Sequence, residues 1–127
     1  MNENQINEKL KQINTENIIW AIYIVIIVMS WYANSLEKKY YLYNDNKSKE
    51  RYRSIMATIF LILIVVYFYF FKGSYDDIKK IKQTDSKKKK ELLYLSLLAS
   101  LFILLSGLIF FYISIVDDNL DVELAFN

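Results

Sequence analysis

Three long apolar stretches alternate with polar ones along the 127-residue chain. The apolar stretches cover residues 18–33, 55–71 and 92–116, and none of them contains a charged residue. A helix needs about 20 apolar residues to cross the hydrocarbon of a bilayer, within a range of about 17–25. The pattern therefore predicts an all-α membrane protein with transmembrane helices at residues 18–34, 55–72 and 92–116.

A soluble helical domain is the alternative interpretation, because a buried core helix can also be apolar on every side. Three such helices would each have to be covered by other protein, and the rest of this chain is too short and too polar to do so. Trp20 and Trp31 lie near the two ends of the first stretch. Since tryptophan favours the membrane–water interface, both residues are predicted to be interface anchors.

The polar segment at residues 1–17 precedes the first predicted span. Ile6, Leu10 and Ile13 recur at helical spacing, which predicts a short amphipathic surface helix. A cleaved signal peptide is the alternative, because Ala-Asn-Ser at residues 33–35 fits a cleavage site. The leading segment is long and slightly acidic, whereas a signal peptide begins with a short basic region, so the surface helix is favoured.

Two polar loops separate the spans. Loop one, residues 35–54, is basic and rich in tyrosine, and Asn-Asp-Asn at 44–46 predicts a turn between helices that extend beyond the bilayer. Loop two, residues 73–91, is rich in lysine. Here Gly73 is expected to end the second span, and Ser74 with Asp77 resembles a capping box, which predicts a short helix over residues 75–82. Thr-Asp-Ser at 84–86 is expected to cap the third helix.

The tail, residues 117–127, is acidic and has no basic residue. Its apolar residues alternate with polar ones, so it is either a strand that docks on a partner or a disordered end. Asp117, Asn119 and Asp121 match the opening of an EF-hand loop, but Val122 occupies the position that requires glycine. The sequence therefore predicts no dedicated metal site.

The charges indicate an orientation. With three spans, residues 1–17 and loop two lie on one side of the membrane and, together with Lys72 at the end of the second span, carry ten Lys and Arg residues, whereas loop one and the tail carry six. Basic residues near span ends favour the cytoplasm. This predicts the plasma membrane of a bacterium, with the N-terminus cytoplasmic and the C-terminus outside. The tail's acidic residues are expected to pair with basic residues of loop one.

The composition argues against catalysis. The chain has no His, Cys or Pro. It therefore lacks the commonest general base and the thiolate and imidazole metal ligands. No serine lies near a lysine inside a predicted span, which leaves no nucleophile with a base. We expect no catalytic residues, no metal and no cofactor.

The third span carries small residues on one face. Ser100, Gly107 and Ser114 recur every seven residues, and Ser96 lies one turn before Ser100. Small residues allow helix backbones to approach closely in a membrane. This face is predicted to pack either against the other spans of the same chain or against another protein or second copy.

Four consecutive lysines, Lys87, Lys88, Lys89 and Lys90, precede the third span. Successive residues fan out around a helix axis, so these lysines are predicted to form a collar that contacts anionic lipid headgroups and helps to set orientation. Nucleic-acid binding would require a broader basic surface.

The expected function is that of a small non-enzymatic membrane protein that acts through helix packing, as an accessory subunit of a larger membrane complex or as a homo-oligomer. The alternative is a homo-oligomeric pore or channel. In size, three spans and a charged tail, the chain resembles some phage holins in outline, which implies pore formation. The acidic tail differs from the basic tail usual in that group.

Overall fold

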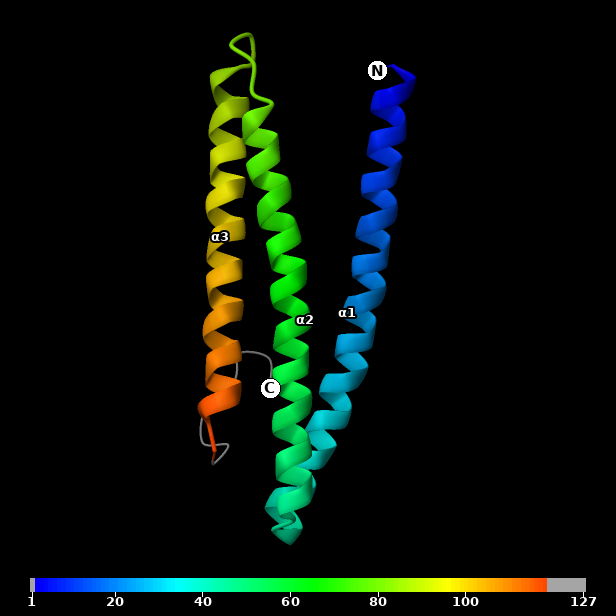
Figure 1. The fold of residues 1–127 in the computed structure, drawn as a ribbon, viewed down its shortest axis with the longest axis vertical. Helices are drawn as coiled ribbons and strands as arrows, with labels where there is room; N and C mark the ends of the chain where they lie inside the picture. Colours follow the sequence, from blue (N-terminus) through cyan, green and yellow to red (C-terminus); the bar gives the residue numbers. More distant parts are fainter. Residues whose placement is uncertain (1, 119–127) are drawn as a thin grey trace. The chain divides into compact units, whose positions relative to one another are not determined.

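A computed structural model describes residues 2–118 and contains three helices: α1 (Glu3–Tyr43), α2 (Asn46–Lys79) and α3 (Lys87–Val116) (Figure 1). Each helix is long and apolar enough to cross a membrane, and residues 2–118 contain no strand. The all-α fold class is confirmed, and the three apolar helices fit a small multi-pass membrane protein. The prediction that the tail is either a docking strand or a disordered end falls on residues outside the described part of the chain, and so do Asn119 and Asp121 of the stretch that resembles an EF-hand opening.

The chain divides into two units, residues 1–52 and 53–127, which are described separately. In the first unit, α1 begins at a capping box in which the Asn2 side chain accepts a hydrogen bond from the Gln5 backbone N–H at 2.9 Å. The Gln5 side chain accepts one from the Asn2 N–H at 3.1 Å. The predicted surface helix is the first part of α1, which runs into the span without interruption. No Pro or Gly lies in this stretch to break it.

The turn between α1 and α2 lies at residues 44–45, within the Asn-Asp-Asn stretch at 44–46 that predicts a turn. Asn44 adopts the left-handed conformation with φ 52°, a role that asparagine tolerates. Asp45 follows, and its carboxylate accepts hydrogen bonds from the Ser48 hydroxyl at 2.9 Å and the Lys47 backbone N–H at 3.1 Å. The Ser48 bond is the largest cause that holds the pKa of Asp45 below its ordinary value, and the backbone bond adds to it. A carboxylate therefore starts α2 at its positive dipole end.

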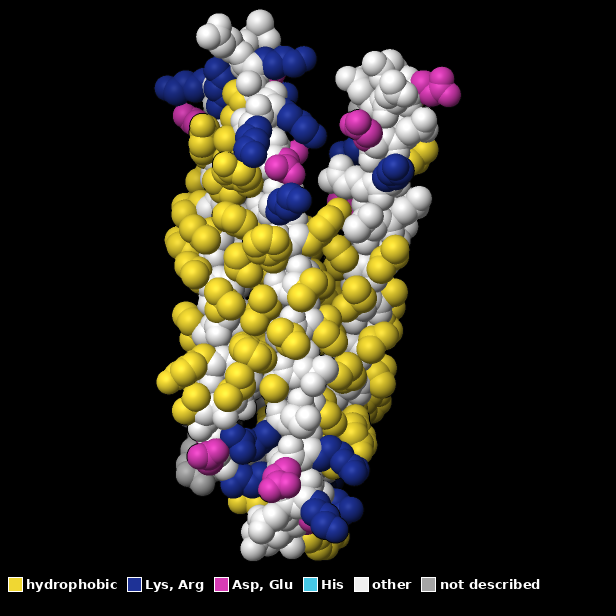
Figure 2. All heavy atoms as spheres, in the orientation of Figure 1, with side chains coloured by type: hydrophobic (Ala, Val, Ile, Leu, Met, Phe, Trp, Pro, Cys, Tyr) yellow, Lys and Arg dark blue, Asp and Glu magenta, His cyan; other side chains and the backbone are white. Residues whose placement is uncertain are grey.

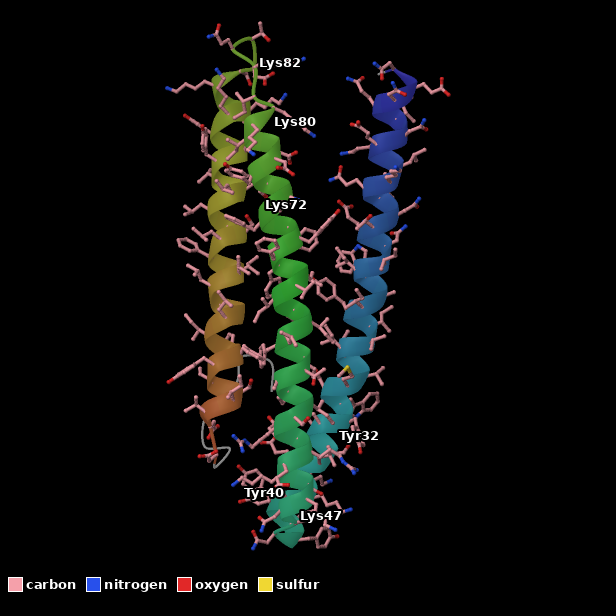
Figure 3. The ribbon with its side chains drawn as sticks, in the orientation of Figure 1. Tyr32, Tyr40, Lys47, Lys72, Lys80 and Lys82 are labelled. Carbon is pink, nitrogen blue, oxygen red and sulfur yellow. The ribbon has the colours of Figure 1, made fainter. Side chains whose placement is uncertain are left out.

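Aromatic residues join the two helices of the first unit near this turn. Arg51 Nη1 donates to the Tyr32 hydroxyl at 3.4 Å, and Lys49 Nζ lies 5.4 Å from the centroid of the Tyr40 ring. Figure 3 labels Tyr32 and Tyr40 at this end of α1. Contacts of cations with tyrosine rings and hydroxyls suit the headgroup region, where these amphipathic side chains are favoured.

In the second unit, α2 and α3 run antiparallel and side by side (Figure 1). Phe60 of α2 stacks on Phe110 of α3, with ring centroids 5.6 Å apart and an interplanar angle of 18°. Figure 2 shows apolar side chains along the middle of both helices and charged side chains at their ends. Lys72, Lys80 and Lys82 are labelled at the loop-two end in Figure 3. This distribution matches an apolar slab between two polar zones.

Loop two differs from its prediction. Gly73 does not end α2, because the helix continues to Lys79 and no glycine has a positive φ. The separate helix predicted over residues 75–82 is wrong, and Ser74 and Asp77 lie inside α2 instead of at a cap. A glycine inside a helix costs about 1 kcal/mol relative to alanine. That cost does not stop a helix whose following residues contain no proline.

The start of α3 confirms the predicted cap. Ser86 is the N-cap, and its hydroxyl accepts a hydrogen bond from the Lys89 backbone N–H at 3.1 Å. The preceding Asp85 accepts from the Lys82 backbone N–H at 2.9 Å and pairs with Lys89 Nζ at 3.2 Å. These contacts, the Lys82 bond foremost, lower the pKa of Asp85.

The end of α3 is joined to the start of α2. Arg53 Nη2 donates to the Ile115 carbonyl at 2.7 Å and pairs with Asp118 at 3.0 Å. A cation is stabilising at this negative end of the helix dipole. The predicted pairing between the tail and the basic residues of loop one is confirmed for Asp118.

Replacing Arg53 with methionine is expected to loosen the last turn of α3. The hydrogen bond from a charged donor contributes about 1.5–3 kcal/mol. The ion pair adds less, about 0.2–1 kcal/mol, because the Asp118 side chain is 77% exposed. Hydrogen–deuterium exchange in lipid nanodiscs should show faster exchange at residues 113–117 in the variant. Arg51→Met is the control, since the Arg51 guanidinium donates to the Tyr32 hydroxyl of α1. Equal exchange in wild type and R53M would contradict this role.

Candidate functional site

The small-residue face of α3 lies against α2. Ser100, Gly107 and Ser114 are buried. A Cβ atom built on Gly107 would lie 3.0 Å from Cδ2 of Tyr67 and 3.5 Å from Cγ1 of Ile64. The first distance is shorter than ordinary van der Waals contact, so the glycine makes room for the Tyr67 ring. This is the kind of close approach for which small residues are enriched between membrane helices.

The serine hydroxyls on this face serve mainly their own helix. Ser100 Oγ donates to the Leu97 carbonyl at 2.8 Å, and Ser114 Oγ donates to the Phe111 carbonyl at 2.7 Å. Such bonds satisfy a hydroxyl locally and leave little for a partner helix.

Ser96 makes the contact between helices. Its hydroxyl lies 3.4 Å from that of Ser74 in α2, and either atom can be the donor. Sequence reasoning selected Ser96 but placed Ser74 in a helix cap, and it did not select Tyr67. The seven-residue spacing identifies a face of α3, but it carries no information on which residues of α2 meet it.

The four lysines at the start of α3 have different neighbours. Lys87 and Lys90 share one open face of α3 with Glu91, Tyr94, Leu95 and Leu98, because residues three, four and seven apart lie on the same side of a helix. Lys89 instead pairs with Asp85. The lipid-contacting and orienting role of the four lysines stays a prediction.

The open face of α3 that contains Lys87 and Lys90 is charged at its start and apolar further along the helix. Its first turn presents two ammonium groups and one carboxylate, and the next two turns present a tyrosine and two leucines. Lysine is a compact point charge that binds phosphate oxygens.

The two tryptophans of α1 are exposed, Trp20 by 65% and Trp31 by 77%. The Trp20 ring contacts the Tyr23 ring edge-on at a centroid distance of 5.7 Å. Eleven residues of helix separate their Cα atoms by about 16 Å, less than the roughly 30 Å of hydrocarbon. Each side chain must therefore extend away from the bilayer centre for both to reach opposite headgroup regions.

The described part of the chain, residues 2–118, contains no group of three or more Asp or Glu residues arranged to hold a metal ion. Comparison with protein families, with curated proteins and with solved structures finds no match for this chain.

Proposed function

We propose that this small multi-pass membrane protein has no catalytic machinery and acts through helix packing, as an accessory subunit or oligomer. Support comes from the part of α1 that precedes its apolar run. Residues 3–17 form about four helical turns, and at 1.5 Å per residue they extend about 22 Å beyond residue 18.

The observation that carries the proposal is the exposure of apolar side chains on this extension. Ile6, Leu10 and Ile13 are 45%, 52% and 42% exposed, and they are the only large aliphatic side chains among residues 2–17. Lipid covers exposed apolar side chains only within the bilayer. An apolar stripe in the aqueous zone is typical of a surface that another protein covers.

The distribution of basic residues supports a membrane location, an orientation and a lipid contact. We propose the plasma membrane of a bacterium, with the N-terminus and loop two cytoplasmic, because basic residues are more numerous on that side. Anionic phospholipid headgroups would contact residues 73–91, with the ammonium groups of Lys87 and Lys90 on the open face of α3 as the contact site. Nucleic acid is not part of the proposal, because the basic residues form no broad surface with a groove partner.

The alternative, a homo-oligomeric pore, would need polar side chains that face a lumen. Of the four serines in the third span, Ser100 and Ser114 are buried and donate to carbonyls of their own helix, whereas Ser96 and Ser106 are exposed. Only the two exposed serines could face a lumen, and dye release decides whether they do.

Dye release tests the choice between these functions. Purified protein reconstituted into liposomes that contain a self-quenching dye is expected to cause no leakage above that of protein-free liposomes, at any protein density. A pore-forming peptide added to the same liposomes is the positive control. Leakage that rises with protein density would contradict the accessory function and support the pore.

A further inference from the structure

We propose that residues 6–17 of α1 form a parallel helix–helix seam with the same segment of a second copy of this chain. This inference rests on the proposed function and names the partner of the exposed stripe. The seam consists of Ile6, Leu10, Ile13 and Asn17.

The spacing of the stripe is that of a coiled coil. The steps from Ile6 to Leu10, Ile13 and Asn17 are four, three and four residues, which places Ile6 and Ile13 at heptad d positions and Leu10 and Asn17 at a positions. The next positions of this register are Trp20, Ile24 and Ile27, which are exposed by 65%, 63% and 63%. The same spacing also occurs in amphipathic helices that lie on a membrane surface, so the direction of α1 decides between the two occupants.

The membrane surface is also a poor occupant for geometric reasons. To lie on the bilayer, residues 3–17 would have to turn away from the direction of the span. Helix α1 is continuous from Glu3 to Tyr43 and has no proline or glycine at which a sharp kink could form. The stripe therefore projects into water, where a partner helix must be equally upright.

A second copy meets that requirement. Two copies in one membrane share depth and direction, so equivalent residues lie at the same height and the pairing is parallel and in register. Asn17, an exposed residue, would then face Asn17 of the partner copy. A single asparagine at an a position fixes register in parallel coiled coils, since amides of neighbouring copies can bond to each other, whereas leucine at a with isoleucine at d favours more than two strands.

The charges beside the seam permit this pairing. Lys9 and Glu16 occupy g positions, and Asn7 and Asn14 occupy e positions. In a parallel pair, g residues of one helix face e residues of the other, so each charge meets an uncharged partner. No like charges oppose each other across the seam.

The absence of cysteine from the chain makes a direct test practical. Single cysteines are introduced at seam positions 6, 10, 13 and 17 and at control positions 8, 12 and 15, each in the full-length protein in isolated membranes. A mild oxidant then forms disulfides, which require Cα atoms about 4.4–6.8 Å apart. We expect several-fold more dimer at the four seam positions than at the three controls. Equal cross-linking at all seven positions, none at any, or a maximum at 8, 12 and 15 would overturn the seam.

A second pair of variants separates specific pairing from random collision. With Ile6→Cys as the reporter, Leu10→Ser combined with Ile13→Ser should abolish cross-linking, whereas Gln12→Ser combined with Thr15→Ser should leave it unchanged. Equal loss or equal retention in both pairs would contradict the proposal. Dye leakage would defeat the proposed function whatever the cross-linking pattern, whereas an even pattern without leakage would defeat the seam alone.

Discussion

Replacing Gly107 with leucine, alone or together with Ser100→Leu, is expected to destabilise the α2–α3 pair. A Cβ atom at Gly107 would already lie 3.0 Å from the Tyr67 ring, and leucine adds three more carbon atoms in the same direction. Overpacking of this kind costs about 1–3 kcal/mol. Thermal unfolding of the detergent-solubilised protein, followed by circular dichroism, should show a lower midpoint for G107L and a still lower one for the double variant.

Ser106→Leu is the matched control. Ser106 neighbours Gly107 but is exposed, and its hydroxyl donates to the Phe102 carbonyl of its own helix at 2.9 Å. The same increase in side-chain volume should therefore have little effect there. Equal midpoints for G107L and S106L would show that the small-residue face does not support the contact with α2.

Replacing Lys87, Lys88, Lys89 and Lys90 with glutamine is expected to weaken the orientation of the protein or to make it mixed. The four lysines are a large share of the basic residues on the proposed cytoplasmic side. Each contributes about 1 kcal/mol near an anionic membrane surface. Accessibility of a terminal epitope tag to protease, in sealed vesicles of known sidedness, measures the fraction of each orientation.

A second quadruple variant gives the opposite expectation. Replacing Lys38, Lys39, Lys47 and Lys49 of loop one removes basic residues from the other side and should strengthen the original orientation. Unchanged orientation in the first variant would refute an orienting role for Lys87 to Lys90. Loss of orientation in the second variant alone would place the orienting charge in loop one.

The three membrane spans follow from the sequence because the length and the lack of charge of each apolar run depend on local composition alone. The cap at Ser86 and the turn at Asn44 were predictable for the same reason, since a capping hydroxyl and a left-handed asparagine act on their own segment. Gly73 was predicted wrongly. Glycine permits a helix to end but does not force it, and the surrounding residues continue α2 to Lys79.

Contacts between segments were less predictable. The spacing of Ser100, Gly107 and Ser114 marks a face, but its neighbour Tyr67 lies 40 residues before Gly107 and no local pattern connects them. An ion pair between loop one and the tail was predictable, since an odd number of spans brings both to one side of the membrane, and Arg53 with Asp118 is such a pair. The particular hydrogen bond to the Ile115 carbonyl depends on the register of α2 against α3.

If the protein acts by associating with other helices, the species purified in mild detergent must be heavier than one chain. Full-length protein is extracted from its native membrane, purified in a mild detergent, and analysed by native mass spectrometry. The account predicts a species that contains two or more copies of the 15.2 kDa chain, or one copy bound to a larger membrane complex. A single unaccompanied chain in every mild detergent tested would contradict it.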